Sequence, residues 1–345
     1  MPVYNNENSL EASIASLLNQ SMFDIELILI NDGSTDGSAQ ICNRYQSLEP
    51  LIVEVIHQPR SGFGAARNKG LSIATGKYVY FANATDVYEK RMLETNVRLA
   101  EEKEADLVVF GFSVQNKLAT TELTEYLPNL PFLPNKKRFR NHFRNFSHFY
   151  PYMLSNKLYK RNHILKHRFK LFNLNEENEA YFNLALYKDI ETVAFNRHAF
   201  YIRPSEFFNE EISFSQKNFD TQIDIANYLE VVIKGWGLEN EFEDVILQAF
   251  FNAVYSEIML ICKEDSDLSL EEKETRVSHI LNDERIKPYF KRFGAIKEKS
   301  PLKRALLPIL QNGNGKTAIQ VITHVNGTKE KTSKVLGLLR NLLNK

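Results

Sequence analysis

The first part of the chain alternates between short apolar runs and segments in which apolar residues recur every three to four positions. The apolar runs have the continuity of strands covered on both faces, and they lie at residues 25–30, 52–56, 77–81 and 106–110. The periodic segments are typical of helices and lie at residues 10–18, 38–45, 64–74 and 91–103. Strands that alternate with helices predict βαβ units and a mostly parallel sheet with helices on both faces.

The rest of the chain is less uniform. Residues 113–150 are polar and aromatic with scattered prolines, which favours extended segments and loops. From about residue 220 to residue 262 the helical period returns strongly. We therefore predict an α/β domain over residues 1–205, a helical region over residues 206–284 and a tail over residues 285–345.

The composition is that of a globular protein, with 43% hydrophobic and 25% charged residues. Cys42 and Cys262 form neither a disulfide framework nor a CxxC motif, which suits a reducing compartment. The N-terminus has no signal-peptide pattern, and no apolar run approaches the roughly 18 residues of a membrane-spanning helix. We expect a cytoplasmic protein that is either free or peripheral on the inner face of the membrane.

The charge is unevenly distributed, although the whole chain carries 43 basic and 43 acidic residues. Residues 285–345 contain 14 of the basic residues and two of the acidic residues. Residues 1–284 therefore contain 29 basic and 41 acidic residues. The tail also carries apolar residues: Tyr289, Phe290, Phe293, Leu306, Leu307, Val335, Leu336, Leu339, Leu342 and Leu343. A basic amphipathic segment suits an anionic membrane surface.

Two other interpretations of the tail stay open. The tail could form a helix that packs on the acidic body or on a partner protein. It could also bind nucleic acid, but it lacks a recognition motif, so we expect no nucleic acid partner.

Three motifs interrupt the apolar pattern: Asn31–Ser38, Gly62–Gly70 and Asn83–Asp86. Open α/β sheets bind ligands at the carboxyl ends of their strands, so the loops after residues 3, 30 and 81 should share one crevice. There Asp32 could accept a hydrogen bond from a base or ribose, and Ser34 could cap a helix whose N-terminus suits a phosphate. Arg67 adds a cationic group for a diphosphate. Each residue alone is explained by turn and cap chemistry, but the ordered set favours a nucleotide site.

The ordered set resembles the family 2 glycosyltransferases, bacterial enzymes with the GT-A nucleotide-diphospho-sugar fold. The resemblance runs in register through Pro2–Asn5, Ser16–Gln20, Ile30–Gly37, Ala65–Leu71, Gly76–Phe81 and Ala105–Val108, and it resumes at Asn156–Arg161 and Tyr181–Leu184. It implies a Rossmann-like, mostly parallel sheet with a helical C-terminal extension. It also implies inverting transfer of a sugar from a nucleotide-diphosphate donor, with UDP-sugars favoured, to a glycan or lipid-linked acceptor. Capsule, exopolysaccharide and teichoic acid are the expected products.

The resemblance assigns roles to individual residues. The nucleotide-sugar site would comprise Pro2, Val3, Tyr4, Asn5, Asp32, Ser34, Arg67 and Asn83. In such enzymes an acidic motif at a strand end holds Mn²⁺ or Mg²⁺, which neutralises charge on the leaving group. A carboxylate at the start of a later helix accepts the proton of the acceptor hydroxyl.

The metal motif departs from the family pattern. The family has Asp-Ser-Asp-Asp there, whereas this chain has Asn83-Ala84-Thr85-Asp86. Asp86 is the one acid left and our candidate metal ligand, and Asn83 and Thr85 offer neutral oxygens that bind hard cations less tightly than carboxylates do. We expect a weak or lost metal site. A catalytically inactive, glycosyltransferase-like partner subunit is therefore the alternative function.

The candidate general base also departs from the pattern. The register of Phe182-Asn183 places Asn178-Glu179 where the family has Glu-Asp. We assign Glu179 as the base, with Glu177 and Glu176 as alternatives because the register is open. An acidic helix start stabilised by the helix dipole is the competing interpretation.

The third departure is at the N-terminus, where the family has several apolar strand residues before Pro-Val-Tyr-Asn. This sequence begins at Met1-Pro2. We expect either that the natural protein starts upstream or that the strand is missing and the sheet edge is altered. The N-terminal mass of the native protein distinguishes the two.

Overall fold

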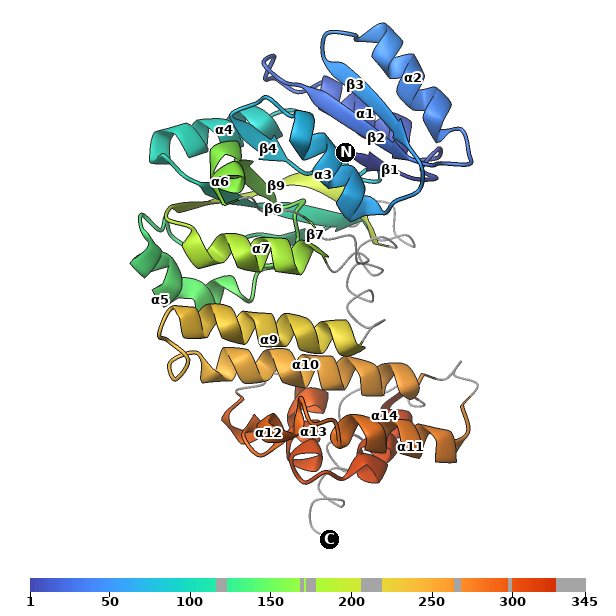
Figure 1. Ribbon diagram of the computed structural model, residues 1–345, viewed down its shortest axis with the longest axis vertical. Coiled ribbons are helices and arrows are strands. Elements are labelled where there is room, and N and C mark those ends of the chain that lie inside the picture. Colours follow the sequence, from blue (N-terminus) through green and yellow to red (C-terminus); the bar gives the residue numbers. More distant parts are fainter. Residues whose placement is uncertain are drawn as a thin grey trace. The chain divides into compact units, whose positions relative to one another are not determined.

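The computed structural model describes residues 1–115, 123–167, 171, 178–205, 219–263, 268–296 and 300–326. The chain divides into two compact units, residues 1–212 and residues 213–345. The described strands all belong to unit 1, and the described part of unit 2 is helical (Figure 1).

The first sheet of unit 1 is parallel, with strands β1 (Pro2–Val3), β2 (Leu27–Asp32) and β3 (Val53–Gln58) in that order. Every residue of β2 is buried. Successive side chains of β2 point to opposite faces of the sheet. On one face, Ile28 and Ile30 pack with Ala66 of α3 (Phe63–Ile73). Leu27 and Leu29 instead join the main core with residues of α1 (Leu10–Leu18) and α2 (Ser38–Leu48). This two-sided burial explains the continuous apolar run in the sequence.

The second sheet of unit 1 is mixed and has the order β4–β8–β6–β9–β5, with β7 paired to β6. Its strands are β4 (Tyr78–Tyr80), β5 (Val87–Tyr88), β6 (Leu107–Gln115), β7 (Leu123–Tyr126), β8 (Lys157–Lys160) and β9 (Val193–Pro204). Strands β6 and β9 are parallel, whereas β8 runs antiparallel to both β4 and β6. The first sheet is parallel, as expected of a mostly parallel sheet, whereas the second sheet mixes both directions.

Four further helices complete the described part of unit 1: α4 (Met92–Lys103), α5 (Lys136–Phe146), α6 (Arg161–Lys166) and α7 (Asn178–Asp189). Helix α4 contacts β6 and β9. Helix α5 turns Phe139, Phe143 and Phe146 inward, where all three are at most 1% exposed and contact Tyr187 of α7. These aromatic contacts fix α7, whose first turn carries Glu179.

A cavity of about 420 Å³ lies between the two sheets. Residues 24–28 line it on the β2 side and residues 75–82 on the β4 side. The amine of Met1 donates to the carbonyl oxygen of Ile28 at 2.8 Å, and burial, aided by the charge of Arg67, lowers the pKa of this amine to about 5. The expectation of upstream residues stays a prediction.

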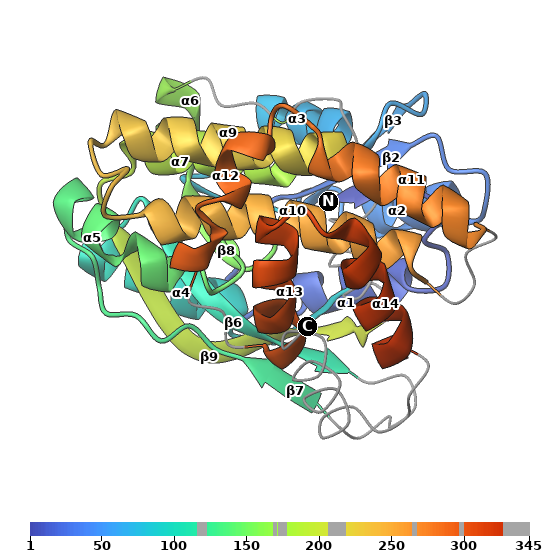
Figure 2. The ribbon, with the colours of Figure 1, turned by 90° about the horizontal axis from the view of Figure 1, so that it is seen from below.

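The described helices of unit 2 are α9 (Phe219–Gly235), α10 (Glu243–Ile261), α11 (Leu270–Leu281), α12 (Lys287–Phe290), α13 (Pro301–Gln311) and α14 (Gly315–Asn326). Helices α9 and α10 run side by side, and α14 contacts α11 and α13 (Figures 1 and 2). Among the described helices, α10 is long and apolar enough to cross a membrane by length and composition alone, but half of its apolar window is buried inside the protein.

The first half of the basic tail packs into unit 2. Four of its apolar residues are at most 6% exposed, namely Phe290, Phe293, Leu306 and Leu307. Basic residues pair with acids of the same unit, Arg285 with Asp220 at 2.5 Å and Arg292 with Glu243 at 2.7 Å. This corrects the expectation that these apolar residues face a membrane, because their hydrophobic surface is already covered. The stripe from Val335 to Leu343 lies outside the described residues.

Candidate active site

Asp32 ends β2 and is fully buried. Its Oδ1 accepts hydrogen bonds from Gln58 Nε2 at 2.7 Å and from the Ser61 amide at 2.9 Å. Its Oδ2 accepts from the Gly62 amide at 2.8 Å and from Arg60 Nη1. Burial alone would raise the pKa of Asp32, but these hydrogen bonds together hold it below its ordinary value. Asp32 therefore organises the loop that leads into α3, and a bound base or ribose would share this carboxylate with the loop.

The loop after β1 lies against the loop after β2, as the strand-end rule predicts. The amide of Asn5 donates to Ser34 Oγ at 3.2 Å, and the amide of Thr35 donates to Asn5 Oδ1 at 2.8 Å. The guanidinium of Arg60 lies 3.7 Å from the centre of the Tyr4 ring. Arg60 was not named as a site residue from the sequence. Its position two residues before Gly62, which precedes α3, places it in the loop of the Gly62–Gly70 motif.

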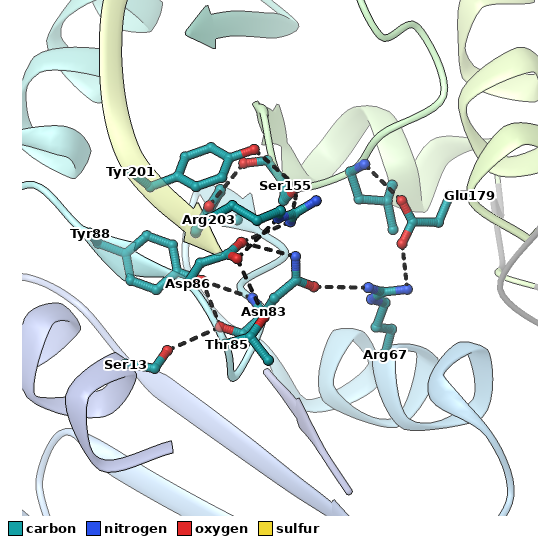
Figure 3. Close-up of polar contacts among 12 residues, drawn as sticks. Ser13, Arg67, Asn83, Thr85, Asp86, Tyr88, Ser155, Glu179, Tyr201 and Arg203 are labelled. Atoms are coloured by element: carbon teal, nitrogen blue, oxygen red, sulfur yellow. Dashed lines mark hydrogen bonds and ion pairs between the residues drawn. The ribbon is translucent and has the colours of Figure 1, made fainter. Parts of the chain in front are cut away.

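The strand-end motif at residues 83–86 is held by side chains from several elements (Figure 3). The hydroxyl of Tyr88 accepts from the amide of Asn83 and donates to its carbonyl oxygen, both at 2.8 Å. Ser13 Oγ donates to the same carbonyl at 3.0 Å. The side chain of Asn83 then joins two groups, since its Oδ1 accepts from Arg67 at 3.2 Å and its Nδ2 donates to Asp86 at 3.1 Å.

Asp86 forms a buried ion pair with Arg203 of β9. Arg203 Nε and Nη2 donate to the two carboxylate oxygens at 3.0 and 2.8 Å. The two side chains are 2% and 0% exposed. Burial alone would lower the pKa of Arg203, but the adjacent carboxylate outweighs this effect and raises it. In this structure Asp86 is the counter-ion of Arg203, and its assignment as a metal ligand stays a prediction.

The residues of this motif do not fit a divalent cation. Such ions take several oxygen ligands and favour carboxylates. Here the oxygens of Asp86 accept from Arg203, and Asn83 Oδ1 accepts from Arg67. Across the part of the chain that the structure describes, no three His, Cys, Asp or Glu side chains converge on a common point.

Glu179 and Arg67 form the second ion pair of the site. Arg67 Nη1 lies 2.8 Å from Glu179 Oε1, and the two side chains are 7% and 15% exposed. The amide of Leu154 donates to Glu179 Oε2 at 3.0 Å. Arg67 Nε is buried and has no hydrogen-bond partner within the described residues. A nearly buried guanidinium with a spare donor is suited to an anionic ligand.

The structure thus brings Arg67, Asn83 and Glu179 into one chain of contacts, and it places Asp32 with Ser34 and Asn5 at the neighbouring strand ends. Pro2 and Val3 pair with β2 beside them. The alternative bases Glu176 and Glu177 lie outside the described residues. Arg203, which sequence reasoning missed, follows Asp86 by 117 positions and carries no local signal of the pairing.

Comparison with known proteins identifies the class. Residues 1–167 match the model of glycosyl transferase family 2. The uncharacterized glycosyltransferase EpsJ of Bacillus subtilis (strain 168) is 29% identical over 207 residues, which are 59% of each chain. The minor teichoic acid biosynthesis protein GgaA of the same organism is 42% identical over 100 residues, 28% of this chain and 22% of GgaA. The likeness to family 2 lies in residues 1–167, and the chain spans only part of the length of these relatives.

A solved structure extends the likeness to the fold of most of the chain. Residues 1–349 of S. aureus TarS, crystallised with UDP-GlcNAc, superpose with a TM-score of 0.66 at 19% identity. The match covers 94% of this chain and 89% of that chain. The GT-A fold with a helical C-terminal region is therefore confirmed.

Proposed function

We propose that this protein is an inverting glycosyltransferase that moves a sugar from a UDP-sugar to an acceptor hydroxyl during bacterial cell-surface glycan synthesis. The observation that carries the proposal is the 2.8 Å contact between Arg67 and Glu179. Transfer needs a cation at the departing diphosphate and a base at the attacking hydroxyl, and here the two candidates touch. The UDP-GlcNAc bound by TarS and the teichoic acid pathway named for GgaA support the donor and the product class.

The chemistry follows from these two residues. Glu179 accepts the proton of the acceptor hydroxyl as its oxygen attacks the anomeric carbon of the sugar. The bond from that carbon to the diphosphate breaks, UDP leaves with the electron pair, and the configuration inverts. Arg67 stabilises the negative charge that develops on the diphosphate. Asp32, Tyr4, Asn5 and Ser34 hold the nucleoside at the neighbouring strand ends, together with Pro2, Val3 and Asn83.

The proposal assigns donor binding to protein side chains rather than to a metal. The resemblance implies Mn²⁺ or Mg²⁺, but Asp86 is already neutralised by Arg203. We therefore expect a weak or absent metal requirement. The cation at the diphosphate is then the guanidinium of Arg67.

The chemistry belongs to residues 1–205 in this proposal, with residues 206–284 and 285–345 as helical support and tail. We place the protein in the cytoplasm, with a glycan or lipid-linked acceptor at the inner face of the membrane. Residues 327–345 carry five basic residues and one acid, which supports peripheral attachment to an anionic surface. Loss of sedimentation with anionic liposomes on removal of residues 327–345 is the matching test.

The deciding experiment is calorimetric titration of the purified chain with UDP, GDP and UDP-sugars, each with Mn²⁺ and with EDTA. We expect UDP to bind in the micromolar range, as a nucleotide held by several charged and stacking contacts does. EDTA should change the dissociation constant by less than about threefold, because the carboxylate of Asp86 is already engaged by Arg203.

Each contrary outcome has a definite meaning. A gain of tenfold or more with Mn²⁺ would restore a metal to the mechanism, because about 1.4 kcal/mol of binding would then depend on it. Absence of nucleotide binding by a folded sample would overturn the proposal in favour of the inactive partner subunit. Binding of DNA or RNA that falls steeply with salt would favour the nucleic-acid alternative.

A further inference from the structure

Lys157 of β8 is a fully buried lysine whose ammonium contacts only oxygens in the hydrogen bonds that the structure gives it. Its Nζ donates to the carbonyl oxygens of Tyr150 at 3.0 Å and Met153 at 2.6 Å, and to Asn156 Oδ1 at 2.7 Å. An ammonium has three donors and no acceptor, so these three oxygens match it fully. Burial lowers the pKa of Lys157 well below its usual range, and the charge of Glu179 opposes this shift. Such a costly group needs a reason to be inside the protein.

The oxygens that Lys157 binds belong to an irregular segment, residues 150–155, which we name the 150–155 segment. Buried carbonyls of irregular backbone need donors from elsewhere. Tyr187 donates to the carbonyl of Pro151, and Asn183 donates to that of Tyr152 at 2.7 Å. Four successive carbonyls, those of residues 150–153, therefore accept from side chains of β8 and α7. Tyr150 has φ 42°, a left-handed conformation that such contacts must maintain.

The 150–155 segment contacts both ion pairs of the site. The amide of Leu154 donates to Glu179 Oε2 at 3.0 Å, and the hydroxyl of Ser155 accepts from Arg203 at 2.9 Å. One turn of backbone thus connects the ammonium of Lys157 to the candidate base. A carboxylate at the start of a helix is held in direction only by such contacts, and the direction sets how well it reaches a hydroxyl.

We infer that Lys157 is a positioning residue for Glu179: its buried ammonium fixes the 150–155 segment, and the amide of Leu154 then holds the carboxylate in place beside Arg67. The inference rests on the proposed role of Glu179 as the general base. Lys157 does not touch the substrate. It acts through one peptide group, so its removal should affect the chemical step and leave nucleotide binding by Arg67 and Asp32 in place.

The test compares Lys157→Met with Lys160→Met, a control on the same strand whose lysine is half-buried and pairs with Asp106 at 3.5 Å. The readout is release of UDP from the UDP-sugar found by titration, with water as acceptor. For Lys157→Met we expect kcat to fall by about 10- to 100-fold, the scale of misplacing a catalytic group. The dissociation constant of UDP should stay within about threefold, because binding groups are untouched. Lys160→Met should keep both values.

A purely structural role predicts a different pattern, which a double variant detects. In the Glu179→Gln background, Lys157→Met should cause no further loss of kcat, because the group it positions is gone. A loss in that background equal to the loss in the wild type would overturn the inference. So would equal losses of kcat and UDP affinity in the single variant. If Lys157→Met does not fold, Lys157→Gln, which keeps two donors, carries the same comparison.

Failure of the proposed function looks different again. If Glu179→Gln alone leaves kcat unchanged, or if the wild type binds no nucleotide, the base assignment itself is wrong. If Glu179→Gln abolishes turnover while Lys157→Met does not change kcat, the function stands and only the positioning role is overturned.

Discussion

Two arginine–carboxylate pairs occupy the candidate active site, and they differ in their surroundings. Asp86 and Arg203 are buried almost completely and bond through both carboxylate oxygens. Arg67 and Glu179 are 7% and 15% exposed and share one contact, and the buried Nε of Arg67 has no hydrogen-bond partner among the described residues. The same chemistry therefore serves two purposes. The first pair closes a network inside the fold, whereas the second is the pair that would meet the ligand in the proposed function.

This difference shows how an acidic motif can change its role. The family pattern places a metal at the strand end, where this chain keeps one acid of three. Asn83 and Thr85 stand where the family has carboxylates, so Asp86 is the one acid of this motif. Its negative charge is balanced by the guanidinium of Arg203. In the proposed function the acid that takes part in the chemistry is Glu179 on α7.

The largest effect should come from breaking the second pair at its carboxylate. Glu179→Gln keeps the size of the side chain and removes the base, so kcat should fall by about 100- to 10,000-fold. UDP binding, measured by calorimetry, should persist because Arg67 and Asp32 remain. Asp189→Asn, at the other end of α7, is the control and should retain activity. Unchanged turnover in Glu179→Gln would direct attention to Glu176 and Glu177.

The second largest effect is expected on the stability of the protein when the Asp86–Arg203 pair is broken. Asp86→Asn and Arg203→Met should each lower the free energy of unfolding by about 3–5 kcal/mol, because each leaves a buried charge without its partner. The double variant should lose less than the sum of the two. Urea unfolding measures all three. If Asp86→Asn keeps wild-type stability and instead abolishes a Mn²⁺-dependent gain in UDP binding, Asp86 is a metal ligand and the contrast between the pairs disappears.

The smallest effect is expected at the cation of the second pair. Arg67→Met removes hydrogen bonds to a charged group that are worth about 1.5–3 kcal/mol, so UDP should bind roughly 10- to 100-fold more weakly. Calorimetry with UDP and with uridine separates the diphosphate from the base, since uridine binding should not change. Arg91→Met, a mostly exposed site on the same unit, should behave as wild type. Equal losses for UDP and uridine would show that Arg67 serves the fold and not the diphosphate.

Much of the first sheet could be predicted from sequence because its determinants are local. Strand β2 is an apolar run that is buried on both faces, and polar residues mark its carboxyl end. The rule that ligands gather at strand ends then places Asp32, Ser34 and Arg67 near one another without any structure. The direction of β8 in the second sheet, and the packing of Phe290 and Phe293 in unit 2, could not be obtained this way. Both depend on partners that are distant in the chain.

The sequence by itself indicated the resemblance to family 2, most strands and helices of the first 110 residues, and a short set of residues that could bind a nucleotide-sugar, because periodicity and motif spacing are local properties. It missed helix α5 (Lys136–Phe146), where extended segments and loops were expected. Only the tertiary structure decided which partners each acid meets. Asp86 acquires Arg203 from 117 residues away, and Glu179 acquires Arg67 and the amide of Leu154 from two other elements. The availability of a carboxylate depends on the charges and donors that folding brings to it, and the residues around it in the sequence do not encode them.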